Sequence, residues 1–149
     1  MANKKILPPT YLFISILLMA TFHFFFPLVE VIAYPWVLIG CLPLFLGIAL
    51  NLIADKAFKL CNTTVKPFQE STVLITTGVF GVTRHPMYLG MILILLGVAI
   101  LTGSLTPFFV VPVFAIIMEK IFVNIEERML AEKFGETWLE YKSKVRRWI

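Results

Sequence analysis

Four long apolar runs, separated by shorter polar segments, dominate the pattern of the chain. They cover residues 11–29, 35–54, 87–101 and 107–125. A helix of about 20 apolar residues is long enough to cross a bilayer, and the run 11–29 contains no charged side chain. The pattern therefore predicts an all-α integral membrane protein with about four transmembrane helices.

Two polar stretches accompany these runs. Residues 55–86 form a long connection, and residues 126–149 form a tail. Apolar side chains recur in the tail at spacings of three and four, the period of an amphipathic helix: Leu130, Phe134, Trp138, Tyr141 and Val145. Gly135 is a candidate break in that helix. We expect a C-terminal amphipathic helix; one structural interpretation is a helix that lies on the lipid headgroups.

The composition agrees with a membrane protein. Of 149 residues, 59% are hydrophobic and 15% are charged, and the mean hydropathy is +0.89. A soluble domain has about half apolar and about a quarter charged residues, so we predict a single membrane domain over residues 1–149. Lys4 and Lys5 precede the first run, as in a signal peptide. That run is long and no clear cleavage site follows it, so a retained helix is expected.

The basic residues are confined to alternate segments. Lys and Arg number 13 against 9 Asp and Glu, a formal net charge of +4. All of the basic residues except Lys120, near the end of the fourth run, lie in the N-terminus, the connection 55–86 and the tail, whereas the short loops 30–34 and 102–106 contain none. The positive-inside rule then predicts that both termini and the connection are cytoplasmic. We therefore interpret the excess of positive charge as setting the orientation of the protein in the membrane, where its partners are lipids. We do not expect it to bind nucleic acid.

The segment 84–90 joins the polar connection to the third apolar run. Pro86 has no N–H and a fixed φ, which suits the first position of a helix, and His85 would then lie at or next to its N-cap. The unpaired amides and the positive dipole of a helix N-terminus favour an anion. Arg84 adds donors there, so the segment predicts an anion-binding site at the cytoplasmic edge of the membrane.

Acidic residues follow the fourth run. Glu119 and Glu126 are seven residues apart, two turns on one helix face, and Glu127 lies on a neighbouring stripe. One structural interpretation is a helix that leaves the bilayer and becomes solvated. However, the third and fourth runs are joined by a short link, so the anion site and the carboxylates could lie close together and bind a zwitterionic ligand. One His and two neighbouring Glu are too few ligands for a metal site, so no metal is predicted.

Several motifs resemble the isoprenylcysteine carboxyl methyltransferases, over roughly residues 63–148. The segment 84–90 matches their R-H-P-x-Y-x-G signature, and the Glu126-Glu127 pair matches their paired acids. Other similar segments are Thr63-Thr64-x-x-Pro67, Leu74-x-Thr76-x-Gly78, residues 134–145 and Arg147-Trp148. Phospholipid N-methyltransferases share parts of this pattern.

The resemblance implies a membrane enzyme that uses S-adenosylmethionine. Its cofactor-binding residues would be Arg84, His85, Pro86, Tyr88, Leu89 and Gly90, with the methionine carboxylate at the helix start, and Glu126 and Glu127 on the amino group or ribose hydroxyls. Arg146 or Arg147 would act in catalysis by pairing with the acceptor carboxylate. The implied acceptor is a lipidated cysteine that enters from the bilayer between helices.

The chemistry of the acceptor leaves more than one function open. A carboxylate is already ionised at pH 7, so methyl transfer to its oxygen requires no general base, and the expected function is O-methylation of a lipophilic, isoprenylcysteine-like acceptor. An amine acceptor would make the protein a phospholipid N-methyltransferase. Two further functional classes compete with methyl transfer: an NADPH-dependent reductase of the sterol-reductase type and a membrane scaffold without catalysis.

Overall fold

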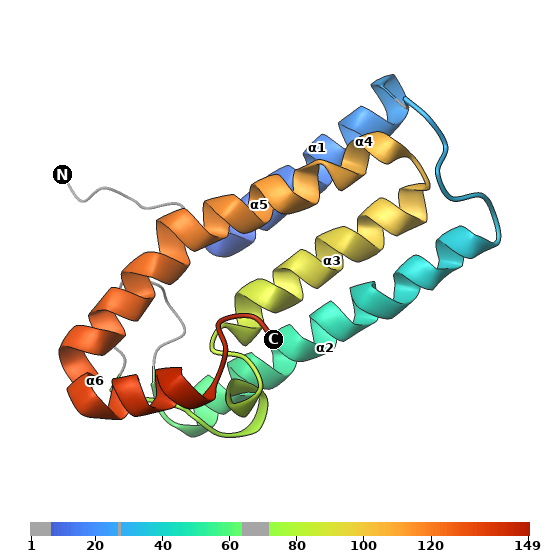
Figure 1. Ribbon diagram of the computed structural model, residues 1–149. Helices are drawn as coiled ribbons and strands as arrows, with labels where there is room; N and C mark the ends of the chain where they lie inside the picture. The colour runs from blue at the N-terminus through green and yellow to red at the C-terminus, as the bar shows by residue number, and fades with distance from the viewer. Residues whose placement is uncertain (1–6, 27, 64–71) are drawn as a thin grey trace.

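The computed structural model describes residues 7–26, 28–63 and 72–149 (Figure 1). Lys4, Lys5, Thr64 and Pro67, which carry part of the sequence signal, lie outside these ranges. The elements, in order, are α1 (Pro8–Phe25), η1 (Trp36–Gly40), α2 (Cys41–Leu60), η2 (Gly78–Gly81), α3 (Pro86–Thr102), α4 (Leu105–Phe108), α5 (Val110–Met118), η3 (Glu119–Val123) and α6 (Asn124–Lys144). η1 and η2 are 3₁₀ helices and η3 is a π-helical turn.

The prediction of an all-α integral membrane protein is confirmed. The described residues contain no strand, only an isolated bridge between Glu30 and Ser104. Three helices among them are long and apolar enough to cross a membrane: Pro8–Phe25, Trp36–Leu60 and Leu105–Lys144. The apolar helix α3 is shorter, at 17 residues. It lies between α2 and the α4–α5 segment (Figure 1).

The helix α2 continues to Leu60, beyond the end of the apolar run at residue 54. An ion pair of 2.5 Å between Lys59 Nζ and Asp55 Oδ2, one turn apart, supports this extension. The start of the predicted connection 55–86 is therefore helical. The apolar pattern indicates where a bilayer could surround the helix, not where the helix ends.

Close contact between glycines holds η1 and α2 against α3. A Cβ added to Gly97 would lie 2.7 Å from the carbonyl oxygen of Gly40, and one added to Gly90 would lie 2.8 Å from that of Gly47. Such distances force neighbouring atoms to move, so these positions require glycine. Small residues are the usual means by which membrane helices approach each other closely.

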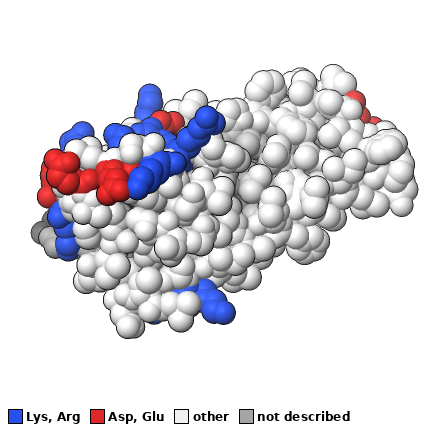
Figure 2. Space-filling model, turned by 60° about the horizontal axis from the view of Figure 1, so that its bottom comes forward, with Lys and Arg blue, Asp and Glu red and all other residues white. Residues whose placement is uncertain are grey.

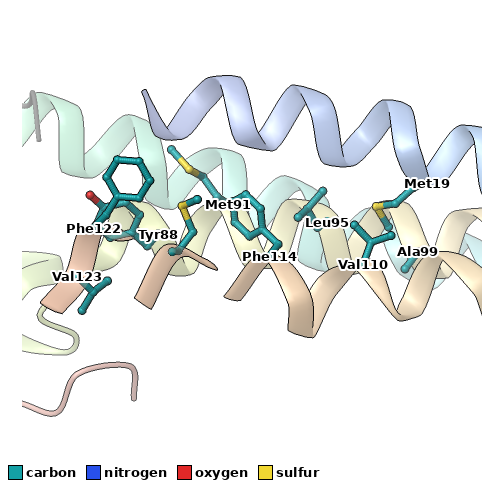
Figure 3. Close-up of a cluster of buried hydrophobic side chains, with 10 residues drawn as sticks. Met19, Tyr88, Met91, Leu95, Ala99, Val110, Phe114, Phe122 and Val123 are labelled. Carbon is teal, nitrogen blue, oxygen red and sulfur yellow. The ribbon is translucent and has the colours of Figure 1, made fainter. Parts of the chain in front are cut away.

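A second contact joins α3 to α1 and α5. Met19 of α1, Leu95 of α3 and Phe114 of α5 are almost completely buried (Figure 3). The cluster extends to Tyr88 of α3 and Phe122 of η3, whose rings are stacked with centroids 6.1 Å apart. This packing positions the first turn of α3 beside the segment where α5 passes into α6.

The C-terminal helix bends at Gly135, as the sequence indicated. Gly135 has φ of 50°, a backbone conformation that favours glycine. The apolar stripe beyond the bend does more than face lipid headgroups, because Trp138, 2% exposed, and Tyr141 are buried within the protein. The Tyr141 hydroxyl donates a hydrogen bond of 2.6 Å to the carbonyl of Phe80 in η2. The C-terminal half of α6 thus supports the loop that precedes α3.

Charged side chains gather at one end of the molecule. On the face shown in Figure 2, most Lys and Arg atoms lie at the end formed by α6, and the opposite end shows acidic atoms and no basic ones. This separation agrees with the sequence pattern, in which the short loops 30–34 and 102–106 contain no Lys or Arg.

Candidate functional site

The loop before α3 ends as predicted. His85 is the N-cap of α3 and Pro86 occupies the first helical position. The backbone N–H of His85 donates to the hydroxyl of Thr83 at 3.3 Å. The His85 side chain, 4% exposed, therefore sits at the positive end of a 17-residue helix.

The first residues of α6 meet this helix start. The Tyr88 hydroxyl donates a hydrogen bond of 2.5 Å to Glu126 Oε1. His85 Nε2 lies 3.2 Å from Glu127 Oε1, and His85 Nδ1 lies 3.7 Å from Glu126 Oε2. The predicted proximity of the two polar clusters is confirmed, and the two adjacent carboxylates converge on one imidazole.

Arg84 lies beside Glu127, and part of its guanidinium has no hydrogen-bond partner among the described residues. Its side chain is 8% exposed, and its Nη2 lies 3.4 Å from Glu127 Oε1. The guanidinium carbon is 5.7 Å from the centre of the Trp138 ring. Nε and Nη1 are buried and have no hydrogen-bond partner in the part of the chain that the structure describes. A buried donor without a partner is costly, so a ligand atom that accepts a hydrogen bond fits here.

Arg147 reaches the same carboxylates from the C-terminal end. Its Nε and Nη2 donate to the two oxygens of Glu127 at 3.1 and 2.7 Å, and its Nη1 donates to Glu119 Oε1 at 2.6 Å. These hydrogen bonds to Glu127, together with the charge of Glu119, raise the pKa of the Arg147 guanidinium above its ordinary value. Arg147 is therefore already bonded through three nitrogens. The side chain of the other candidate, Arg146, is exposed, while its carbonyl accepts from the Arg84 N–H at 3.1 Å.

The π turn changes which acidic residues share a face, and our expectation for Glu119 was wrong. We expected it to align with Glu126, but it shares Arg147 with Glu127, eight residues along the chain. The π pattern of i→i+5 hydrogen bonds accommodates an additional residue in the turn. A continuous α-helix was the simplest assumption, and nothing in residues 119–123 signalled otherwise.

The remaining candidates of the segment 84–90 lie in the first turns of α3. Pro86 is buried and Leu89 is half-buried. Gly90 faces α2, where an added Cβ would meet the side chain of Asn51 and the carbonyl of Gly47. Helix packing alone accounts for a glycine there, and its contact with a cofactor stays a prediction.

The assembled site carries both charges. Three carboxylates, two guanidinium groups and one imidazole lie at the junction of α3 and α6, beside the rings of Tyr88 and Trp148. Such a group can bind a ligand that has acidic and basic parts. Among the described residues, no group of three or more His, Cys, Asp or Glu side chains is arranged to hold a metal ion.

A matching protein family and two curated relatives of this chain are methyltransferases. Residues 35–137 match the phospholipid methyltransferase family. A protein-S-isoprenylcysteine O-methyltransferase of Saccharomyces cerevisiae is 34% identical over 132 residues, which cover 82% of this chain and 54% of that enzyme. The enzyme of the same name from Schizosaccharomyces pombe is 32% identical over 76 residues, covering 49% of this chain and 31% of the enzyme.

A relative of another class also matches. A Delta(14)-sterol reductase of Methylotuvimicrobium alcaliphilum is 33% identical over 82 residues, 52% of this chain and 18% of that protein. No solved structure matches the chain significantly. The chain spans about half the length of the Saccharomyces cerevisiae enzyme and about a third of the Schizosaccharomyces pombe enzyme. With the family matched over residues 35–137, the chain belongs to the phospholipid methyltransferase family and is similar to the two protein-S-isoprenylcysteine O-methyltransferases.

Proposed function

We propose that the protein is a membrane methyltransferase that uses S-adenosylmethionine and methylates the carboxylate of a lipophilic, isoprenylcysteine-like acceptor. The observation that carries this proposal is the convergence of His85 and Tyr88 from α3 with Glu126 and Glu127 from α6. These residues belong to the segments that resemble the methyltransferase signatures. They form one cluster although 42 positions separate His85 from Glu127.

The residues present fit the cofactor. Arg84 has two buried donors without partners among the described residues, and a carboxylate is a suitable acceptor for them. Glu126 and Glu127 can accept hydrogen bonds from an ammonium group or from hydroxyls. When bound, S-adenosylmethionine supplies a methyl group activated by its sulfonium. The residues of this site would bind and orient it; none of them is required as a nucleophile.

The acceptor carboxylate needs a cation to hold it and a site from which water is excluded. A carboxylate with a pKa near ~3.7 is ionised at pH 7 and can react without a base. The exposed guanidinium of Arg146, or that of Arg147 once it leaves Glu127, would hold this carboxylate. Tyr88 and Trp148 place aromatic rings beside His85, at centroid distances of 5.9 and 6.5 Å. These rings would exclude water and could face a cationic sulfonium.

The charge distribution supports a cytoplasmic site. The N-terminus, the connection and the tail contain all the basic residues except Lys120, and the positive-inside rule assigns such segments to the cytoplasm. The site lies at this charged end, where α3 begins. An acceptor with a lipid chain would keep that chain in the bilayer and present its carboxylate to the site from between the helices.

Calorimetric binding to the protein in detergent tests the proposal. We expect S-adenosylmethionine and S-adenosylhomocysteine to bind and His85→Ala to weaken both at least about tenfold, the effect of losing one charge-assisted hydrogen bond. His23→Ala is the matched control. His23 lies near the C-terminal end of α1 and contacts Ser104, which follows the C-terminal end of α3, whereas the site lies at the N-terminal end of α3. If folded protein binds neither compound, the proposal is wrong. Binding of NADPH instead would favour the reductase relative.

The acceptor is tested separately with loaded enzyme. We expect N-acetyl-S-farnesylcysteine to become a methyl ester and phosphatidylethanolamine to remain unmodified. If only the amine of phosphatidylethanolamine is methylated, the protein is still a methyltransferase, but the proposed carboxylate acceptor is wrong. The orientation is tested by reaction of single introduced cysteines with an impermeant thiol reagent, which should label the tail only from the cytoplasmic side.

A further inference from the structure

The last residues of the chain lie across the start of α3. We call residues 145–149, which follow the end of α6 at Lys144, the C-terminal strap. Two hydrogen bonds tie its backbone to the loop before α3: the Arg84 N–H donates to the Arg146 carbonyl at 3.1 Å, and the Thr83 hydroxyl donates to the Arg147 carbonyl at 3.0 Å. The strap thereby brings the Arg147 side chain onto the acidic residues.

Arg147 contacts two of these acidic residues, Glu119 and Glu127. Three of its nitrogens each donate to a carboxylate oxygen, two to Glu127 and one to Glu119. Without this cation, Glu119, Glu126 and Glu127 would leave three carboxylates in one place, which is unfavourable. Arg147 is 29% exposed, so its guanidinium can return to water when another cation takes its position.

The adjacent cation, Arg84, differs from Arg147 because part of its guanidinium has no hydrogen-bond partner among the described residues. Its Nε and Nη1 are buried and unpartnered among the described residues, and its Nη2 lies 3.4 Å from the same Glu127. The site therefore combines a replaceable cation on one side of Glu127 with unfilled donors on the other. A ligand that complements both must carry a positive group and a negative group a short distance apart.

We propose that Glu119 and Glu127 form the subsite for the α-ammonium group of the cofactor's amino acid end, which Arg147 fills until the ligand displaces it, while Arg84 receives the α-carboxylate. A primary ammonium has three N–H donors, the number that Arg147 uses on these two carboxylates. This inference rests on the proposed function and adds Glu119, together with a role for Arg147 in the ligand-free protein.

Two ligands separate this subsite from the rest of the cofactor site. S-adenosylhomocysteine carries the amino acid end, and 5′-methylthioadenosine has the same adenosine and thioether without it. We expect Glu119→Gln to weaken S-adenosylhomocysteine binding about tenfold, because one charge-assisted hydrogen bond is lost, and to leave 5′-methylthioadenosine unaffected. Glu140→Gln makes the same charge change at an exposed position of α6 and should alter neither affinity.

Different failures have different meanings. If Glu119→Gln leaves S-adenosylhomocysteine binding unchanged, or weakens both ligands equally, Glu119 does not serve the amino acid end and the inference is overturned. If folded wild-type protein binds neither ligand, the proposed function itself is wrong.

A second variant tests the displacement. Arg147→Gln removes the internal competitor, so S-adenosylhomocysteine should bind more tightly, again by about tenfold. Equal or weaker binding, in protein that unfolds cooperatively, would show that Arg147 does not compete with the ligand.

Discussion

Glu127→Gln removes a negative charge from a carboxylate that Arg84, His85 and Arg147 all contact. The Glu127 side chain is 8% exposed, and so is that of Arg84. Arg147, 29% exposed, can be hydrated when the charge is lost, whereas Arg84 cannot. Because Arg84 already has two nitrogens without partners among the described residues, the substitution would leave it as a buried, uncompensated cation.

The expected cost follows from this burial. Removing one partner of a buried ion pair destabilises a protein by about 3–5 kcal/mol. Glutamine has nearly the same volume and keeps one acceptor oxygen, so we expect the lower end of that range, about 3 kcal/mol. Adding Arg84→Met to the variant removes the stranded cation and should restore part of the loss.

The assay is an SDS titration in mixed micelles, followed by tryptophan fluorescence. The control is Glu140→Gln, because Lys144 Nζ lies 2.6 Å from Glu140 Oε1, as close as the pairs of the site, yet both side chains are about two-thirds exposed. Exposed pairs contribute little, so this variant should unfold like the wild type. Equal stability of the two variants would refute the burial of the Glu127 cluster.

Two further substitutions test the supports of the site. Gly90→Ala should destabilise the protein by about 1–3 kcal/mol, the usual cost of overpacking, because the new Cβ would lie 2.8 Å from the Gly47 carbonyl oxygen. Gly81→Ala, where the nearest atom is 3.5 Å away, is its control in the same SDS titration. Tyr141→Phe leaves the Phe80 carbonyl without its donor and should cost about 1–3 kcal/mol, while a wild-type titration curve would argue against this contact.

Much of the fold was predictable because its signals are local. Hydropathy indicated the three helices that are long and apolar enough to cross a membrane and the shorter apolar helix α3. Pro86 indicated the first position of α3 because its fixed φ and missing N–H suit only a few sites. Gly135 indicated the bend of α6. The convergence of the two polar clusters was also predictable in outline, since a short link makes the flanking helices neighbours.

The details of the site depended on contacts that no local pattern reveals. The side chain of Trp138 appeared to belong to a lipid-facing stripe, yet it packs inside the protein beside Arg84. Arg147 was one of the two residues expected to pair with the acceptor carboxylate. In the structure the strap brings it to Glu119 and Glu127, 28 and 20 positions away, and it pairs with them.

By itself, the sequence determined the class of protein, the helices and the residues from which a charged site could be built. Hydropathy and dihedral restrictions act within a few residues, so they can be recognised along the chain. Tertiary structure decided which charges meet, because that depends on the π turn at Glu119–Val123 and on the return of the strap to α3. A shift of one residue in a helix rotates a side chain by about 100°, and this is why Glu127, instead of Glu126, shares Arg147 with Glu119.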